Sequence, residues 1–299
     1  MLNRRSFLTL ASLAASGWAA KALATQGENA SKTDGSNTFV QKMAKMESSV
    51  GGRLGVAIMD TAQGRRWGYR ADECFPMCST FKFLAAAAVL KRVDQGAERL
   101  ERRIVYRKQD LVPYSPTTGK HAGGNGLSMS QLCEAAMTLS DNTAANLMLE
   151  SLGGPAGLTS FIRSLGDGLT RLDRNEPTLN ESTPGDPRDT TTPDAMVDDL
   201  RKIVLGNALN PASRTLITQW LLDNQTGGKR VRAGLPQGWK VGDKTGTGAH
   251  GSTNTVGVIW TPKGAPLLFA VYLTETDADE ARRSGVHAAV GKLIAQEIA

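Results

Sequence analysis

Residues 78–93 read CSTFKFLAAAAVLKRV, and this alanine-rich run predicts a helix from Phe81 to Val93. Further helical segments follow it along the chain. Ser128 begins one of them, with Gln131 placed to complete a capping box, and Thr143 to Leu152 forms another that ends at two glycines. The middle of the chain is therefore expected to be helical.

Strand-like runs lie on both sides of this helical block. Before it, Arg53 to Met59 and Arg66 to Arg70 flank a turn and predict a hairpin; after it come Thr255 to Trp260 and Leu267 to Leu273. We expect both pairs to share one antiparallel sheet, flanked by an N-terminal and a C-terminal helix. The predicted fold class is α+β, with two lobes and a cleft where they meet.

One predicted lobe is made of two separate segments of the chain, and the other is made of a single segment. An α/β lobe takes residues 38–75 and 225–299, and an all-helical lobe takes residues 76–224. Within the helical lobe, residues 171–193 are rich in Pro, Thr, Asp and Asn and show no periodicity. Loops of this length in compact domains are usually functional or disordered.

The N-terminal segment predicts export. The pair Arg4-Arg5 precedes an apolar run and a small-residue end at Ala22-Leu23-Ala24, the pattern of a twin-arginine signal peptide cleaved after about Ala24. We expect residues 1–24 to be that signal, residues 25–37 to be a flexible leader, and the protein to be periplasmic, meeting the membrane only during export. A membrane anchor is the alternative, but the apolar run is short for a span of about 20 residues.

Composition and charge restrict the classes of function. Hydrophobic residues make up 40 % and charged residues 21 % of the 299 residues, which is typical of a globular protein rather than of a disordered or fibrous one. The net charge is +6, and it falls to +3 without the three cations of residues 1–24. So mild a charge predicts no nucleic-acid partner. Nothing suggests more than a monomer.

Ser79 and Lys82 form the first motif that can do chemistry, S-x-x-K. They lie three residues apart at the start of the predicted helix and share a face. A desolvated lysine can take the proton of a serine hydroxyl and make it a nucleophile, and N–H groups at a helix start can stabilise an oxyanion. Alone, the pair is equally explained as ordinary helix-start and helix-surface residues.

Two further triplets are also ambiguous when taken singly. Ser140-Asp141-Asn142 lies at a helix start, where capping would explain all three residue types, although Ser140 could relay a proton and Asn142 could hold a substrate amide. Lys244-Thr245-Gly246 follows a strand-like run and could offer a cation and a hydroxyl to a carboxylate, with glycine allowing close approach. Three such motifs in this order form a strong signal.

The order of the motifs resembles that of the class A serine β-lactamases, which carry S-x-x-K, S-D-N and K-T-G. The resemblance runs from about Phe39 to the C-terminus and includes Glu176-Pro177-Thr178-Leu179-Asn180. It implies a fold like that of the serine β-lactamases and DD-peptidases. It also implies hydrolysis of the β-lactam ring of penicillin- and cephalosporin-type antibiotics through a serine acyl-enzyme, and hence antibiotic resistance.

The resemblance implies a catalytic role for four residues. Ser79 would be the nucleophile, Lys82 or Glu176 would take its proton, and Ser140 would relay a proton. Glu176 and Asn180 would position and deprotonate the hydrolytic water. A carboxylate and an amide four residues apart on a stiff loop can hold one water in place.

Other residues are implied to hold the substrate or the loop. The backbone N–H groups of the nucleophile and of Thr247 would form the oxyanion hole, and Arg174 with Asp189 would pair across the base of the loop. Arg230 is included because Thr253 stands where many relatives carry a carboxylate-binding arginine. The implied substrate-binding residues are Asn142, Asn180, Lys244, Thr245, Gly246, Thr247, Tyr114 and Arg230.

The cysteines and histidines predict neither a disulfide nor a metal site. Cys74 and Cys78 have an unfavourable spacing for a disulfide, and Cys133 is expected to be free. In some relatives a cysteine at the position of Cys78 pairs with one where this chain has Gly248, so that pair cannot form here. The three histidines are far apart and no phosphate-binding loop is present, so we expect no metal and no cofactor.

Two rival functions share the three motifs. A D-Ala-D-Ala peptidase or transpeptidase normally lacks the Glu-x-x-x-Asn loop, and a non-hydrolysing penicillin sensor would need a membrane anchor. Glu176 and Asn180 therefore favour β-lactam hydrolysis. The spectrum of β-lactams and the sensitivity to inhibitors stay open.

Overall fold

The computed structural model describes residues 37–262 and 264–298. The predicted signal peptide, residues 1–24, lies outside the described residues, and so does the predicted leader except for its last residue. Residue 37 is already helical, so the leader prediction extends one residue too far.

The chain divides into two units, Met1–Lys42 and Met43–Ala299. The described residues of the first unit, 37–42, are helical. Every element below belongs to the second unit, which begins with helical residues 43–50. The lobe boundaries expected at residues 75/76 and 224/225 stay a prediction.

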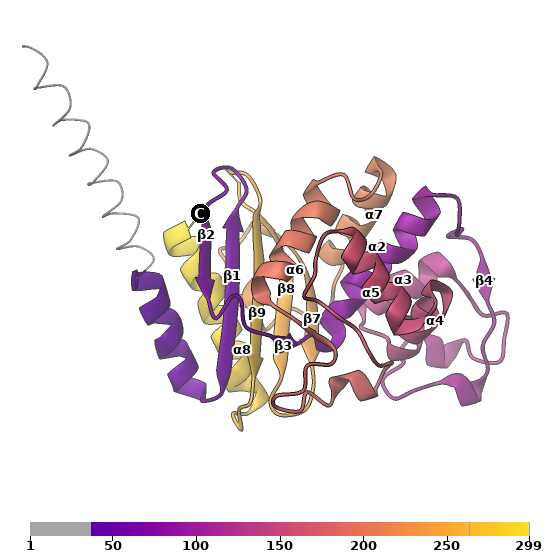
Figure 1. The fold of residues 1–299 in the computed structure, drawn as a ribbon, viewed down its shortest axis with the longest axis horizontal. Helices are drawn as coiled ribbons and strands as arrows, with labels where there is room; N and C mark the ends of the chain where they lie inside the picture. Colours follow the sequence, from indigo (N-terminus) through magenta and orange to yellow (C-terminus); the bar gives the residue numbers. More distant parts are fainter. Residues whose placement is uncertain (1–36, 263, 299) are drawn as a thin grey trace, which may run out of the picture. The chain divides into compact units, whose positions relative to one another are not determined.

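Within the described residues, five strands form one antiparallel sheet in the order β2-β1-β9-β8-β7 (Figure 1). The strands are β1 (Arg53–Asp60), β2 (Arg66–Tyr69), β7 (Lys240–Thr247), β8 (Thr253–Trp260) and β9 (Leu267–Thr274). The expected hairpin is β1 with β2. The strands on either side of the helical block do share one sheet, as predicted.

Strand β7 is longer than predicted. The strand-like run in the sequence extends from Trp239 to Asp243, whereas the observed pairing with β8 runs from Lys240 to Thr247. β-branched residues face one another at the added end, where Thr245 pairs with Thr255, and such pairs favour a strand. The K-T-G motif therefore lies within the edge strand of the sheet and not after it.

The helices predicted at Phe81, Ser128 and Thr143 are present as α2, α3 and α4, and further helices follow them. The helices are α2 (Phe81–Asp94), α3 (Met129–Thr138), α4 (Asn142–Leu152), α5 (Gly154–Ser164), α6 (Pro193–Leu200), α7 (Pro211–Leu222) and α8 (Glu280–Leu293). The capping box at the start of α3 is present, because the Ser128 hydroxyl accepts from the Gln131 N–H and the Gln131 side chain accepts from the Ser128 N–H.

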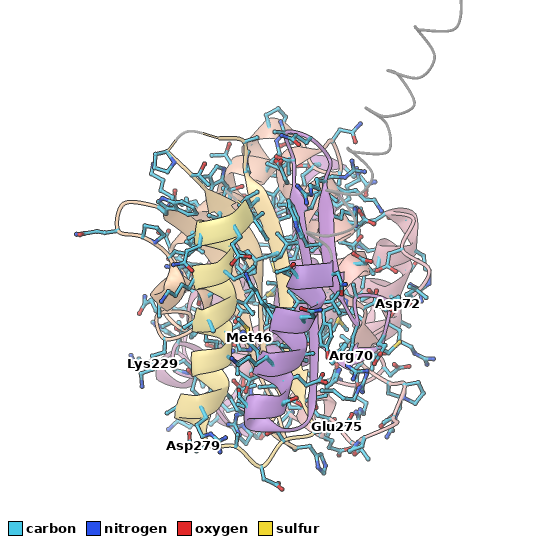
Figure 2. All side chains as sticks on the ribbon, turned by 90° about the vertical axis from the view of Figure 1, so that its left-hand side faces the viewer. Met46, Arg70, Asp72, Lys229, Glu275 and Asp279 are labelled. Atoms are coloured by element: carbon cyan, nitrogen blue, oxygen red, sulfur yellow. The ribbon has the colours of Figure 1, made fainter. Side chains whose placement is uncertain are left out.

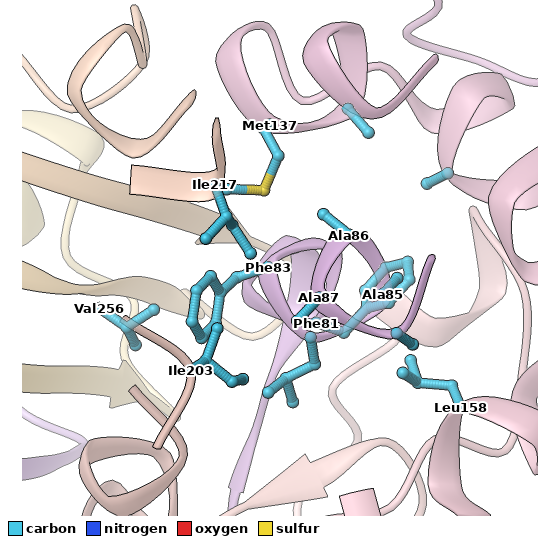
Figure 3. Packing of buried hydrophobic residues seen from close by; sticks show 14 of the residues in the cluster. Phe81, Phe83, Ala85, Ala86, Ala87, Met137, Leu158, Ile203, Ile217 and Val256 are labelled. Atoms are coloured by element: carbon cyan, nitrogen blue, oxygen red, sulfur yellow. The ribbon is translucent and has the colours of Figure 1, made fainter. Parts of the chain in front are cut away.

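Helix α2 occupies the centre of the core. Its residues from Phe81 to Leu90 are all buried, and it packs against α3, α4, α5 and α7. Figure 3 shows the alanines of α2 between Met137 of α3 and Leu158 of α5. Alanine side chains are small enough to let several helices approach one helix at once, which explains the alanine-rich run.

Two layers of helices cover the sheet. Helix α6 contacts β1 and β9, and helix α7 contacts β7. Figure 2 shows the other layer, in which α8 lies beside the helix that carries Met46, both in front of the strands. No helix among the described residues has the length and apolar character needed to cross a membrane.

Short elements connect the larger ones. The 3-10 turns are η1 (Cys78–Thr80), η2 (Lys108–Asp110), η3 (Thr118–Lys120), η4 (Thr178–Asn180) and η6 (Val231–Gly234), and the π turns are η5 (Arg201–Leu205) and η7 (Ile294–Ile298). The short strands β3 (Phe75–Pro76) and β6 (Thr190–Thr191) pair, as do β4 (Arg103–Ile104) and β5 (Leu127–Ser128). Residues 171–193 are otherwise irregular until α6 begins, as predicted.

Candidate active site

Ser79 lies in η1, the turn that leads into the buried helix α2. The Lys82 ammonium donates a hydrogen bond of 2.9 Å to the Ser79 hydroxyl, so the S-x-x-K pair does share a face. The preceding residue, Cys78, has φ of 45°, a conformation that non-glycine residues adopt at a cost. The backbone therefore turns sharply at the nucleophile and is held there by its surroundings.

Lys82 is completely buried among polar partners. Besides Ser79, its Nζ lies 2.8 Å from the carbonyl of Ser140, 2.6 Å from Oδ1 of Asn142 and 2.9 Å from Oε1 of Glu176. Burial lowers the pKa of Lys82, and the nearby negative charge of Glu176 opposes that shift. An ammonium with a lowered pKa can exchange a proton with the serine that it touches.

The S-D-N motif divides into a structural and a functional part. Asp141 caps α4 by accepting from the Ala144 N–H at 2.9 Å, so capping explains that residue. Ser140 and Asn142 instead face Lys82. Ser140 has φ of 61°, which turns both its carbonyl and its hydroxyl toward the two lysines of the site, Lys82 and Lys244.

Glu176 reaches the nucleophile from residues 171–193. Its side chain is buried, and its Oε1 accepts from the Ser79 hydroxyl at 3.3 Å, while Asn180 donates to Oε2. The Glu-x-x-x-Asn element is therefore assembled as predicted. The acid lies within reach of any water that attacks an ester on Ser79.

Asn146 is a site residue that sequence reasoning missed. Its side-chain amide binds both backbone groups of Glu176, accepting from the N–H and donating to the carbonyl at 2.9 Å each. It lies four residues after Asn142 on α4, so both face the same side of the helix. That spacing is the sequence signal that could have identified it.

The base of the loop is closed by the predicted ion pair. Nε of Arg174 donates to Oδ2 of Asp189 at 2.6 Å, and Oδ1 of Asp189 accepts from the N–H groups of Asp173 and Arg174. The Asp189 carbonyl also accepts from the Met77 N–H at 2.9 Å. The loop that carries Glu176 is thus tied to the segment that precedes Ser79.

The K-T-G motif lies beside the nucleophile. Lys244 is fully buried and donates to the Ser140 hydroxyl at 3.0 Å; burial and the positive charge of Lys82 hold its pKa well below the usual value. A Cβ at Gly246 would lie 2.8 Å from the Met77 carbonyl and 3.2 Å from the Ser79 nitrogen. Glycine is therefore what allows β7 to approach the nucleophile.

Arg230 does join this strand. Its guanidinium donates to the hydroxyl of Thr247 at 2.7 Å and to the carbonyls of Gly246 and Asn254 at 2.8 and 2.6 Å. Burial lowers its pKa to about 10. Tyr114, by contrast, is 62 % exposed, and its carbonyl accepts from the Asn142 N–H. Tyr114 therefore lies at the solvent-exposed edge of the site.

All three cysteines are free; Cys78 and Cys133 are buried, whereas Cys74 is exposed. A Cβ at Gly248 would lie 2.7 Å from Sγ of Cys78, so glycine is what leaves that sulfur unpaired. Among the described residues, no three His, Cys, Asp or Glu side chains gather as a metal site requires.

Together these groups can carry out acyl transfer. A serine hydroxyl touches two possible bases, and buried cations lie beside it. An acid and an amide can then activate a water.

Comparisons with known proteins agree with this geometry. A sequence profile of the Beta-lactamase enzyme family matches residues 38–298. The chain is 49 % identical over 256 residues to β-lactamase OXY-1 of Klebsiella oxytoca, covering 86 % of this chain and 88 % of that one. It is 48 % identical over 263 residues to a β-lactamase of Streptomyces albus G, covering 86 % and 84 %. A solved ancestral class A β-lactamase has 63 % identity and a TM-score of 0.85, covering 86 % of this chain and 98 % of that one.

Proposed function

The chain belongs to the class A β-lactamases, and from that premise we propose the part that each site residue plays in opening a β-lactam ring. The enzyme hydrolyses β-lactams through an acyl-enzyme on a serine, and the resulting loss of the antibiotic confers resistance. The observation that carries the assignment of residues is the contact of one hydroxyl, that of Ser79, with both Lys82 and Glu176.

Acylation uses the Lys82–Glu176 pair. Oγ of Ser79 attacks the lactam carbonyl while its proton passes to this pair, and the carbonyl oxygen becomes an oxyanion held by the N–H groups of Ser79 and Thr247. The C–N bond of the ring then breaks. Ser140, which lies between the two lysines, delivers its proton to the departing nitrogen and takes back from Lys82 the proton that left Ser79, so that Glu176 is again a carboxylate.

Deacylation uses the loop residues. Glu176 takes a proton from a water that Asn180 helps to hold, and the resulting hydroxide attacks the ester carbonyl. The C–O bond to Ser79 breaks, the proton returns to the serine, and the opened product leaves.

The substrate is held by groups on both sides of the nucleophile. Asn142 offers its amide to the substrate, while Thr245 and Thr247 offer hydroxyls to the substrate carboxylate, with the charges of Lys244 and Arg230 behind them. Tyr114 forms part of the rim. One chain supplies every group that this chemistry needs, so a monomer suffices. Light scattering of the purified protein tests whether it is monomeric.

The function is tested with a chromogenic cephalosporin and intact mass spectrometry. Many turnovers with a transient adduct on the protein are expected. A single burst followed by a permanent adduct would instead indicate a penicillin sensor or a D-Ala-D-Ala peptidase.

We propose that the protein acts in the periplasm after twin-arginine export. The support is the sequence pattern alone: Arg4-Arg5, an apolar run and a small-residue end before residue 25. Changing Arg4→Lys together with Arg5→Lys should leave the precursor unexported. Normal export in a host that lacks the twin-arginine translocase would contradict the proposal.

A further inference from the structure

The proposed oxyanion hole is made of two segments that lie far apart in the chain. One N–H belongs to Ser79 in η1, and the other belongs to Thr247 at the end of β7. Both must point at one oxygen, and donors of this kind act only when their positions are set to within tenths of an ångström. Something must therefore fix η1 against the end of the sheet.

Asn254 of β8 makes that connection. Its side-chain Nδ2 donates to the carbonyl of Pro76 at 2.9 Å and to the carbonyl of Met77 at 3.0 Å. An amide nitrogen carries two protons, and both are used here. Asn254 is 1 % exposed and its bond to the Met77 carbonyl is buried, so that bond is made without competition from water.

The Met77 carbonyl is a fixed point two residues before the nucleophile. It also accepts from the N–H and the hydroxyl of Thr80, at 3.2 and 2.8 Å. Three donors thus hold the Met77 carbonyl oxygen. The next residue along the chain is Cys78, where the backbone turns sharply. The direction of the Ser79 N–H depends on how this peptide is held.

The backbone of Asn254 is tied to the other half of the hole. Asn254 pairs with Gly246, the residue before Thr247, and one nitrogen of Arg230 donates to the carbonyls of both. Backbone pairing therefore fixes β7 relative to β8. The side chain of Asn254 in turn fixes β8 relative to η1.

The oxygen of the Asn254 amide also indicates that the residue has a special role. Oδ1 of Asn254 is buried and has no hydrogen-bond partner among the described residues. A buried acceptor without a partner destabilises a folded protein. A residue kept in spite of that cost is expected at a place where its donors serve function.

We propose that Asn254 is a positioning residue that sets the spacing between the Ser79 and Thr247 amides and so aligns the oxyanion hole. This inference rests on the proposed function of those two amides. Asn254 itself touches no reacting atom. Losing its amide donors lets η1 shift relative to β7, which weakens the transition state more than it weakens substrate binding.

The test compares Asn254→Ala and Asn254→Asp with Val258→Ala. Val258 is a buried residue on the same face of β8, four residues along, so its truncation destabilises the same strand without touching η1. For each variant, kcat and KM are measured with a chromogenic cephalosporin. The inhibition constant of phenylboronic acid, which forms a tetrahedral adduct on the serine, is measured as well.

We expect both Asn254 variants to lose about tenfold or more in kcat and in boronate affinity together, with KM little changed, while Val258→Ala loses neither. Asn254→Ser serves if the others fail to fold, because a hydroxyl cannot donate to two carbonyls at once. Folded Asn254 variants within twofold of the parent in both quantities would overturn the inference. A parent protein that never opens the cephalosporin would overturn the proposed function instead.

Discussion

Nζ of Lys82 lies 2.9 Å from Oε1 of Glu176, and neither side chain is exposed to solvent. Burying two charges is expensive unless they face each other and are hydrogen-bonded, and both conditions hold here. Burial lowers the pKa of Lys82 while Glu176 works against that shift. Because both groups touch the Ser79 hydroxyl, the pair can accept a proton in one step and supply it in another.

Glu176→Ala should separate the two halves of the reaction. Without the carboxylate no group activates the hydrolytic water, so a penicillin should acylate Ser79 and leave the ester about 100-fold or more longer-lived. Intact mass spectrometry would show the adduct accumulating. Glu134→Ala, an exposed acid on α3, is the control and should turn over normally. Turnover of Glu176→Ala at the parental rate would refute the role of the acid.

Arg230→Ala should weaken recognition of the substrate carboxylate. Arg230 holds the Thr247 hydroxyl and the end of β7, and a charge-assisted hydrogen bond contributes about 1.5–3 kcal/mol. We expect KM for a penicillin to rise about tenfold. Arg230→Lys should recover little, because an ammonium cannot reach the hydroxyl and both carbonyls in the same fork.

A penicillin methyl ester provides the check on that interpretation. The parent enzyme should discriminate strongly between the acid and its ester, and Arg230→Ala should lose most of that discrimination. Arg188→Ala, which removes an exposed arginine paired with Asp186, should behave as the parent does. Equal discrimination in the parent and in Arg230→Ala would show that the guanidinium does not serve the carboxylate.

Much of this architecture could be predicted from local patterns. Strand-like and helical runs located the sheet strands and α2, and the spacing of Ser79 and Lys82 placed them on one face. The spacing from Asn142 could have placed Asn146 on the site face of α4, but the partners of Asn146 and of Asn254 could not be predicted, because each binds backbone groups that are distant in sequence. Backbone acceptors leave no trace in residue type, so such contacts appear only when the chain is folded.

Arg174→Ala should destabilise both the fold and deacylation. Its partner Asp189 is 0 % exposed, and removing the guanidinium leaves that buried charge with only its backbone N–H donors, at a cost of up to about 3–5 kcal/mol. Glu176 lies on the same loop, so the acyl-enzyme should also persist longer. Denaturant unfolding and single-turnover kinetics measure the two effects.

Arg171→Ala is the matched control for that substitution. Arg171 pairs with Asp173 two residues away, and its side chain is 47 % exposed, so the free energy of unfolding should change by less than about 1 kcal/mol. If both arginine variants lost the same stability, the ion pair with Asp189 would not be what closes the loop.

Asp199 of α6 is a buried acid remote from the catalytic motifs. It is 0 % exposed, and among the described residues neither of its oxygens has a hydrogen-bond partner. Burial first, and then the charge of Asp167, raise the pKa of Asp199 to about 8; Asp198 adds to the rise and Lys202, 4.0 Å away, opposes it. The folded protein therefore holds a proton on Asp199 that the unfolded chain releases near pH 4.

The sign of the pH dependence follows from that proton. Between about pH 4 and pH 8 the folded state binds more protons than the unfolded state, so the free energy of unfolding falls as the pH rises, by at most about 1.4 kcal/mol per pH unit. Asp199→Asn keeps a neutral side chain at every pH, so its advantage over the parent should grow from pH 5 to pH 8.5. Urea unfolding across that range measures the difference, with Asp198→Asn, a more exposed neighbour, as the control. Parallel stability curves for the parent and Asp199→Asn would mean that Asp199 is ionised in the folded protein and that its burial is compensated by another group.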